Sequence, residues 1–350
     1  MAATTPTVMN RDTEEKSFVR RHAILLSVLA TMFVVAFIGY LWDPQVTTAV
    51  LNATLRQSTP LLLGALCGLF CERSGVVNIG IEGQMLMAAF VAFMVNAYAP
   101  TWGLDLTVSL WLGLLVGISV GALMGLFHAW MSVTLKIDQI IGGTVINILA
   151  LGLTGYFYQI GVASQSKFLS MPIPVLSDIP LIGPIFFNNG PLTYMSLLLV
   201  FLAQFVIFYT RWGLRTRAVG EHPRAADTVG IKVNFMRYAN VVIGGCLAGL
   251  AGAYLTLEAV GAFERNMTNG RGFVALAVML LGKRTPFGVW GAALLFGFAN
   301  AIQTQLQFGG RIDIPHQFIG MLPYVLTILV LAGFVGRTRD PKALGQPYEK

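Results

Sequence analysis

Long apolar runs separated by short polar stretches occupy most of this chain. A helix needs roughly 20 apolar residues to cross a bilayer. Runs that approach this length cover 23–41, 51–70, 79–98, 107–133, 139–160, 192–210, 238–258, 272–283, 288–307 and 316–335. The run at 272–283 is too short to cross alone, so we expect half of a broken helix there, joined to residues before Gly270.

This pattern predicts an all-α fold, a polytopic membrane helix bundle of about ten transmembrane segments. The transmembrane domain is expected to span 23–335, between an N-terminal tail at 1–22 and a C-terminal tail at 336–350. The second to fifth spans begin outside and the seventh to tenth begin inside, which suggests an inverted repeat. In transporters built this way the solute path runs near the repeat interface.

Composition supports a membrane protein. Hydrophobic residues make up 55% of the chain and charged residues only 11%, with a mean hydropathy of +0.70. A soluble domain carries about 25% charged residues. So few charges do not cover a water-facing surface.

The basic residues indicate the orientation of the bundle. If the N-terminus is cytoplasmic and every span crosses once, eighteen of the 23 Lys and Arg residues fall on inner segments and four on outer ones. Arg56 lies within the second span. Basic residues concentrate on the cytoplasmic side of membrane proteins, so we expect both termini in the cytoplasm and the protein in the cell membrane. The net charge of +7 therefore reflects topology, and we expect no nucleic-acid partner.

Catalytic and metal-binding clusters are not expected. The three cysteines (Cys67, Cys71 and Cys246) lie in or at the end of apolar runs, and the four histidines are scattered. Buried cysteines of this kind usually act as small apolar side chains. We expect a transport subunit without catalytic residues and without a metal site.

Glycines recur at four-residue spacing in the fourth span, at Gly113, Gly117, Gly121 and Gly125. Residues four apart share one helix face, and small residues there let membrane helices approach closely. Gly245 and Gly249 repeat this spacing in the seventh span. The spacing predicts close helix packing.

The largest inner connection, 211–237, contains the sequence HPRAADTVG. Pro223 suits the first turn of a helix and Gly230 its C-terminal stop, which predicts a helix at 223–229 with His222 as its cap. Ala225, Ala226 and Val229 are expected on one face, with Arg224 and Asp227 at its flanks. A helix of two turns is unstable alone, so it packs either on its own bundle or in a groove of a cytoplasmic partner.

Three long stretches resemble the membrane permeases of ABC importers. They are ERSGVVNIGIEGQMLMAAF, GLRTRAVGEHPRAADTVGIKV and GRGFVALAVMLLGKRTPFGVWGAALLFG. The chain is most similar to nucleoside permeases that work with basic-membrane-protein lipoproteins, and more distantly to permeases for simple sugars and branched-chain amino acids. The resemblance runs from about residue 50 to the C-terminal LGQPY.

This resemblance implies a type II-like importer fold and several partners. They are an ATP-binding subunit, a second homologous permease subunit, an extracytoplasmic substrate-binding lipoprotein, a small-molecule solute and membrane lipid. ATP and Mg are expected on the partner ATPase and no cofactor on this chain, which has no G-x-x-x-x-G-K-[ST] phosphate-binding sequence. By the same resemblance, residues 221–230 match the coupling helix that contacts the ATPase. These residues are Glu221, His222, Pro223, Arg224, Ala225, Ala226, Asp227 and Gly230.

A carboxylate, Glu82, stands inside the third apolar run. Asn78 lies four residues before it, so both are expected on one helix face with Met85 and Ala89. Charged groups in spans face the bundle interior or a water-filled cavity. Glu82 therefore either accepts hydrogen bonds from helix ends or pairs with a basic residue such as Arg56, or it lines the solute pathway; we favour a structural role.

Amide side chains are the other polar groups within the spans. Asn300, Gln303 and Gln307 recur at helical spacing, and Asn147 lies in the fifth span. Amides donate and accept hydrogen bonds without a counter-charge, which suits a neutral solute; the alternative is hydrogen bonding between helices. The candidate pathway residues are Asn78, Glu82, Asn147, Asn300 and Gln303. Side chains expected at the outer mouth are Glu258, Phe263, Glu264 and Asn266.

The sequence thus predicts a permease subunit of an ATP-driven importer, with nucleosides as the expected solute. Three alternatives remain open at this stage. They are a permease for sugars or branched-chain amino acids, an ion-coupled transporter with Glu82 as proton carrier, and a non-transporting membrane scaffold.

Overall fold

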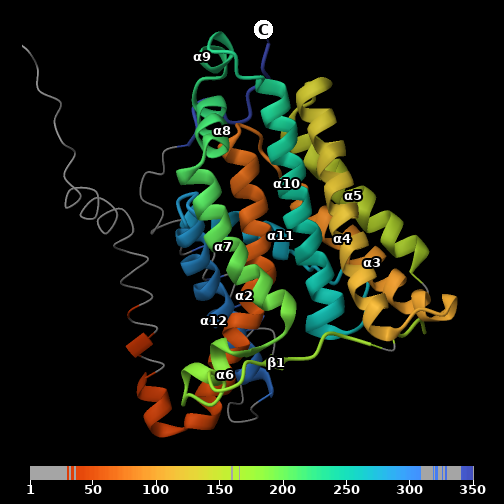
Figure 1. Cartoon of the computed structure of the whole chain (residues 1–350), viewed down its shortest axis with the longest axis vertical. Helices are drawn as coiled ribbons and strands as arrows, with labels where there is room; N and C mark the ends of the chain where they lie inside the picture. The colour runs from red at the N-terminus through yellow and green to blue at the C-terminus, as the bar shows by residue number, and fades with distance from the viewer. Residues whose placement is uncertain are drawn as a thin grey trace, which may run out of the picture.

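The structure is a computed structural model that describes residues 37–158, 161–164, 166–308 and 340–349, with isolated residues at 30, 33–34, 318, 320–321, 325 and 328. The described part is a bundle of helices (Figure 1). The α-helices are α2 (Pro44–Arg73), α3 (Ile81–Tyr98), α4 (Leu106–Ala129), α5 (Gln139–Phe157), α6 (Ile182–Phe186), α7 (Pro191–Tyr209), α8 (Arg211–Glu221), α9 (Pro223–Thr228), α10 (Val233–Tyr254), α11 (Arg271–Leu281) and α12 (Pro286–Phe308). A 3₁₀ helix, η1 (Ala99–Trp102), follows α3, and π-helices η2 (Trp130–Thr134) and η3 (Leu255–Val260) extend α4 and α10.

The all-α membrane bundle predicted from the sequence is confirmed. Among the described residues, six helical segments are long and apolar enough to cross a membrane, and α2 is longer still, with 30 residues. The spans expected at 23–41 and 316–335 fall largely outside the described residues, as do the tail at 1–22 and residues 336–339. The number of ten spans and the inverted repeat therefore stay predictions.

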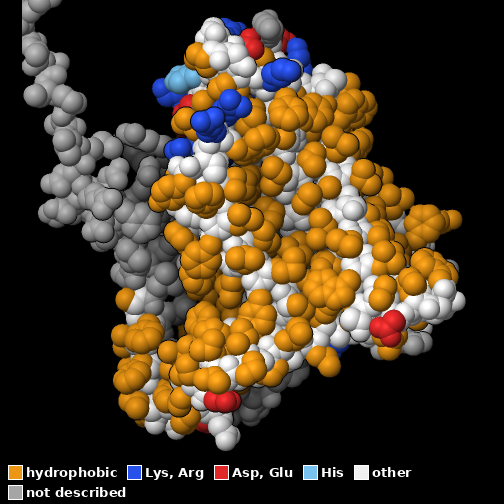
Figure 2. Space-filling view, in the orientation of Figure 1, with side chains coloured by type: hydrophobic (Ala, Val, Ile, Leu, Met, Phe, Trp, Pro, Cys, Tyr) orange, Lys and Arg blue, Asp and Glu red, His pale blue; other side chains and the backbone are white. Residues whose placement is uncertain are grey.

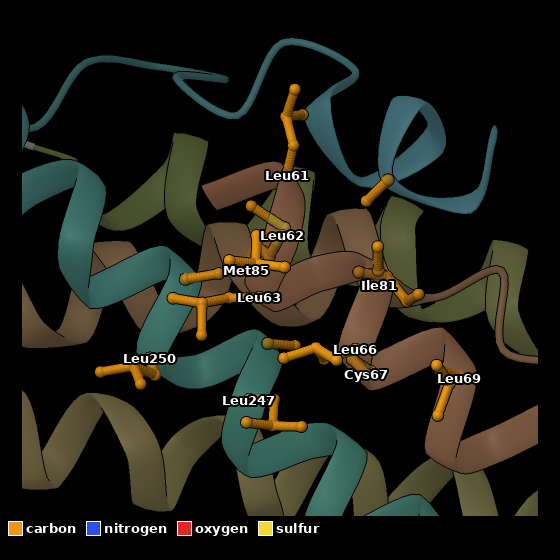
Figure 3. Close-up of a cluster of buried hydrophobic side chains, with 14 of the residues drawn as sticks. Leu61, Leu62, Leu63, Leu66, Cys67, Leu69, Ile81, Met85, Leu247 and Leu250 are labelled. Carbon is orange, nitrogen blue, oxygen red and sulfur yellow. The ribbon is translucent and has the colours of Figure 1, made fainter. Parts of the chain in front are cut away.

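Helix α2 runs through the interior of the bundle (Figure 1). Its middle is buried on all sides, from Leu61 through Cys71. Figure 3 shows its leucines beside side chains of α3 and α10, namely Leu61, Leu62, Leu63, Leu66, Leu69, Met85, Leu247 and Leu250. A helix that is apolar all round is expected in such a position.

Pro60 interrupts the hydrogen bonding of α2. Proline has no N–H, so the carbonyl of Arg56, four residues earlier, loses its usual helical donor. The hydroxyl of Tyr254 donates to that carbonyl at 2.9 Å. This bond attaches the end of α10 to the middle of α2.

The glycine spacing predicted close packing, and the structure confirms it between α4 and α10. A Cβ on Gly121 would lie 2.5 Å from the Cα of Gly249. A Cβ on Gly125 would lie 3.0 Å from the Cα of Gly245. The two helices therefore touch through their backbones, and a larger side chain at either contact would separate them.

Two expectations about individual elements were wrong. Helix α3 begins at Ile81, so Asn78 lies in the turn before it and does not share a helix face with Glu82. Residues 261–264 are irregular and 265–270 form turns, so α11 has no helical half directly before it.

The connection between α5 and α7 carries a small hairpin. Strand β1 (Met171–Pro172) pairs antiparallel with β2 (Asn188–Asn189), with α6 between them. Figure 1 shows α6 and β1 at one end of the bundle, and α8 and α9 at the other.

The distribution of side chains on the surface also distinguishes the two ends of the bundle. Figure 2 shows hydrophobic side chains over the flank of the bundle, whereas Lys and Arg side chains gather around α8 and α9. Exposed apolar side chains on this flank include Leu198, Phe201 and Phe205 of α7. An apolar belt next to a basic end is typical of a membrane-embedded protein. We call the end that carries α8 and α9 the basic end.

Candidate functional site

The predicted short helix of the 211–237 loop is present as α9. Pro223 is its first residue, and His222 takes the N-cap position without a side-chain bond. At its end Gly230 has φ +83 and donates its amide to Asp227 O at 2.9 Å. Proline at the start and glycine after the end are local helix signals, so the sequence sufficed to predict this element.

Only part of α9 packs on the bundle. Ala226 is buried at 3% exposure in a cluster with Val219, Val233 and Met236. The structure does not bury the expected common face, because Ala225 is exposed and Val229 is 75% exposed. Other outward side chains of this stretch are His222, Arg224 and Thr228, while Glu221, Pro223 and Asp227 are half-buried. α9 thus buries one residue against its own bundle and presents an open surface.

Glu82 accepts hydrogen bonds from the start of α11. Its carboxylate oxygens lie 2.8 Å from the amide of Gly270 and 2.6 Å from the amide of Gly272. A carboxylate at a helix N-terminus satisfies amides that lack an intrahelical partner and opposes the helix dipole. Among the interpretations that the sequence left open for Glu82, the structure shows hydrogen bonding to the end of a helix. Arg56 lies elsewhere, 3.5 Å from Asn189 Oδ1.

The turn before α3 enters the buried interior as non-helical backbone, and side chains satisfy it. Asn147 accepts from the Gly83 amide at 2.8 Å and donates to Ile79 O at 3.1 Å. His128 Nε2 lies 2.9 Å from Val77 O. A carbonyl oxygen only accepts, so the imidazole N–H is the donor. Irregular backbone at membrane depth requires such partners. The contact of His128 had no signal in the sequence, because its partner is 51 positions away.

The remaining candidate pathway residues do not meet at one point. Asn78 is fully buried, and its side-chain amide donates to Gln84 Oε1 at 3.2 Å. Asn300 and Gln303 lie half-buried on α12. Asn78, Glu82 and Asn147 thus surround the start of α3, whereas Asn300 and Gln303 lie on α12.

A cavity of about 740 Å³ opens at the end opposite to the basic end. Its wall combines basic and acidic side chains, namely Arg56, Lys167, Arg265, Arg271, Glu258 and Glu264. Asn266 and Asn269 add amides. Glu258, Glu264 and Asn266 were expected near the outer mouth, but the other lining residues come from distant parts of the chain.

Phe263 was expected at the same mouth but is buried at 3% exposure. It packs edge-on against Phe90, with 5.1 Å between ring centroids. Burying a large aromatic ring against α3 stabilises the turn region after η3, which explains why it does not line the cavity.

Glu258 repeats the arrangement of Glu82 at the cavity wall. Its carboxylate accepts from the amide of Leu192 at 2.7 Å and from the hydroxyl of Thr193 at 2.6 Å. These residues are in the first turn of α7. Glu82, which is buried, and Glu258, which is half-buried, thus each bind the start of a helix far away in the sequence.

No candidate metal site is present among the described residues. No group of three or more His, Cys, Asp or Glu side chains there could hold an ion. A polar cavity therefore lies at one end of the helix bundle, and the open surface of the short helix α9 lies at the other.

Comparisons with known proteins agree with this arrangement. Residues 50–331 match the family described as branched-chain amino acid transport system / permease component. The chain is 42% identical over 318 residues to the guanosine ABC transporter permease protein NupQ of Bacillus subtilis, covering 87% of this chain and 98% of that protein. It is 41% identical over 303 residues to the nucleoside ABC transporter permease protein NupC of Lactococcus lactis, covering 85% and 95%.

A third relative is less similar. The guanosine ABC transporter permease protein NupP of Bacillus subtilis is 27% identical over 299 residues, covering 81% of each chain. The family match and the identity along nearly the whole of two relatives show that this chain belongs to the ABC transporter permeases of the branched-chain amino acid transport system / permease component family, the transport components that work with separate ATP-binding and substrate-binding components.

Proposed function

We propose that this chain is the transmembrane permease subunit of an ABC importer for nucleosides. The observation that carries the proposal is the identity of 42% and 41% with permeases named for guanosine and nucleosides, over almost their full lengths. Identity at this level over nearly the whole of both relatives makes a shared solute class the simplest interpretation.

The basic end faces the cytoplasm in this proposal, together with both termini. The gathering of Lys and Arg side chains around α8 and α9 supports this orientation (Figure 2). The cavity of about 740 Å³ then opens to the outside. Its volume is in the range of roughly 300–1,000 Å³ that small-molecule sites occupy, and its mixed polar wall offers donors and acceptors to an uncharged solute.

α9 contacts the ATP-binding subunit, and ATP and Mg are held there. The contact residues are those predicted from Glu221 to Asp227 and Gly230, of which Arg224, Ala225 and the neighbouring Val229 offer open surface. Closure of the ATPase displaces α9 as a rigid body, and the bundle alternates between two packings. Glu82, Asn78 and Asn147 maintain the fold near the pathway, while Asn300 and Gln303 contact the solute.

A second homologous permease completes the membrane unit. Both NupQ and NupP are named guanosine ABC transporter permease proteins of one organism, and this chain is similar to each. A substrate-binding lipoprotein delivers the solute to the outer side. These partners follow from the proposed function.

The test is uptake of labelled guanosine into vesicles that contain the complete transporter. We expect uptake to require ATP, to persist with a protonophore, and to be competed by unlabelled nucleosides. Competition by glucose or leucine instead would assign the solute to sugars or branched-chain amino acids. Uptake without ATP that a protonophore abolishes would favour an ion-coupled transporter, and ATP hydrolysis unaffected by any solute would favour a scaffold.

A further inference from the structure

The C-terminal residues 340–349 fold back across the basic end, and we call them the C-terminal strap. Figure 1 shows the C-terminus beside α9. The strap binds the bundle through its backbone: the amide of Ala343 donates to Gly220 O at 2.9 Å, and the amide of Gly345 donates to Gly75 O at 3.1 Å. It therefore joins the end of α8 to the turn after α2.

The first residue of the strap is tied to the connection between α11 and α12. Asp340 accepts from Arg284 Nη1 at 2.7 Å, and the same guanidinium pairs with Glu72 at 2.5 Å through Nε. Arg73 also donates to the carbonyl of Arg284, at 2.6 and 3.0 Å. Arg284 is only 4% exposed, and buried pairs with additional hydrogen bonds hold a defined geometry.

The other end of the strap lies against α9. Tyr348 packs on the apolar cluster that contains Ala226, the one buried residue of α9. Partial loss of water and a hydrogen bond to the Asp227 carboxylate raise the pKa of Tyr348 above its ordinary value. Arg237, 1% exposed, donates from Nη1 to Gln346 O at 2.8 Å. The strap thus contacts α9 and the helix that follows it.

The contacts form a continuous route from α9 to the cavity. Tyr348 joins α9 to the strap, and Asp340 joins the strap to Arg284 beside α11. At its other end α11 begins with Arg271, which lines the cavity. α9 is six residues long and buries one side chain, so by itself it has few contacts through which to move the bundle.

We propose that the C-terminal strap is a second coupling element, which transmits displacement of α9 to the connection between α11 and α12, with Tyr348 as the positioning residue on α9. The proposal rests on the proposed function, in which α9 contacts the ATP-binding subunit. The strap adds a direct mechanical connection between α9 and α11, two helices that are far apart in the sequence.

The test uses the complete transporter in vesicles and measures guanosine imported per ATP hydrolysed. Tyr348→Ala should lower this ratio about fivefold or more, the lower range of typical coupling between sites. Tyr348→Phe keeps the ring and should change the ratio by less than about twofold, because the hydrogen bond of an exposed hydroxyl contributes little. Tyr156→Ala is the matched control: Tyr156 lies on α5, outside the strap, and is 83% exposed, so the ratio should not change.

Asp340→Asn tests the other end of the route. Its side chain is 59% exposed, so the variant should fold, and the ratio should fall as it does in Tyr348→Ala. The double variant should be no worse than the poorer single variant, because residues in one route are not additive. An unchanged ratio in both single variants would overturn the proposal.

A second readout separates the strap from the choice of solute. A cysteine introduced as Glu264→Cys, in the cavity wall, should change its maleimide labelling when ATP is added, and Tyr348→Ala should abolish that change. If the unmodified transporter imports no guanosine but Tyr348→Ala still abolishes the labelling change, the solute assignment fails and the strap proposal stands. If guanosine import is normal and labelling still responds to ATP in Tyr348→Ala, the strap proposal fails alone.

Discussion

The carboxylate of Glu82 lies 2.6 Å from the backbone amide of Gly272, and the two residues are 190 positions apart in the chain. A Cβ on Gly272 would approach Cα of Glu82 to 2.6 Å. The glycine is therefore required for the carboxylate to reach the helix start. This contact attaches α11 to α3 near the cavity.

Glu82→Gln should destabilise the protein and leave import ATP-dependent. The amide replaces one acceptor oxygen by a donor, which faces a backbone N–H, so one charge-assisted bond of about 1.5–3 kcal/mol is lost. The melting temperature of the purified protein should fall, whereas Glu264→Gln, an exposed change, should stay within about 0.5 kcal/mol. Abolished import with an unchanged melting temperature would instead indicate a proton carrier.

Gly121→Ala should weaken the contact between α4 and α10. The added methyl group meets backbone atoms of Gly249, and overpacking of this kind typically costs about 1–3 kcal/mol. Gly152→Ala is the control, because nothing lies within 4 Å of its Cβ. Thermal unfolding in detergent should show a lower melting temperature for the first variant only, and equal values for both would contradict the packing argument.

Tyr254→Phe should lower the free energy of unfolding, because it removes the donor that replaces the helical hydrogen bond lost at Pro60. Without the hydroxyl, the carbonyl of Arg56 has neither a helical donor nor the 2.9 Å bond from Tyr254. The loss of this part-buried hydrogen bond should cost about 0.5–1.5 kcal/mol. Tyr209→Phe, at a position 73% exposed, is the control and should leave the unfolding free energy unchanged. If Tyr254→Phe also leaves it unchanged, the carbonyl of Arg56 has found another donor.

Val229→Asp should reduce binding of the ATP-binding subunit without unfolding the chain. The side chain is 75% exposed beside α9, and a charge in an apolar contact is costly to bury. Co-purification of the ATP-binding subunit should fall about tenfold, equivalent to about 1.4 kcal/mol. Val175→Asp, 79% exposed at the opposite end, is the control, and normal co-purification of the Val229 variant would place the contact elsewhere.

Arg56→Ala should raise the guanosine concentration needed for half-maximal import. The guanidinium lines the cavity, and its hydrogen bonds within the described part of the chain are long ones of 3.5 Å to Asn188 O and Asn189 Oδ1, so the fold should tolerate its loss. A single lost hydrogen bond to the solute, about 0.5–1.5 kcal/mol, should appear as a severalfold change. Unchanged import kinetics would remove Arg56 from the solute path.

Local patterns in the sequence determined the all-α membrane architecture, the helix ends at Pro223 and Gly230, and the glycine face of α4. Each depends on residues within one or two helical turns, whose hydropathy, backbone freedom or spacing acts locally. The tertiary structure alone decided that Glu82 holds α11, that Asn78 precedes α3, and that Arg56 and Tyr254 share a cavity wall. It also decided that the C-terminal strap reaches α9. These relationships join positions far apart in the chain, and they exist only because the packed helices bring unpaired backbone groups and buried charges to within hydrogen-bonding distance of each other.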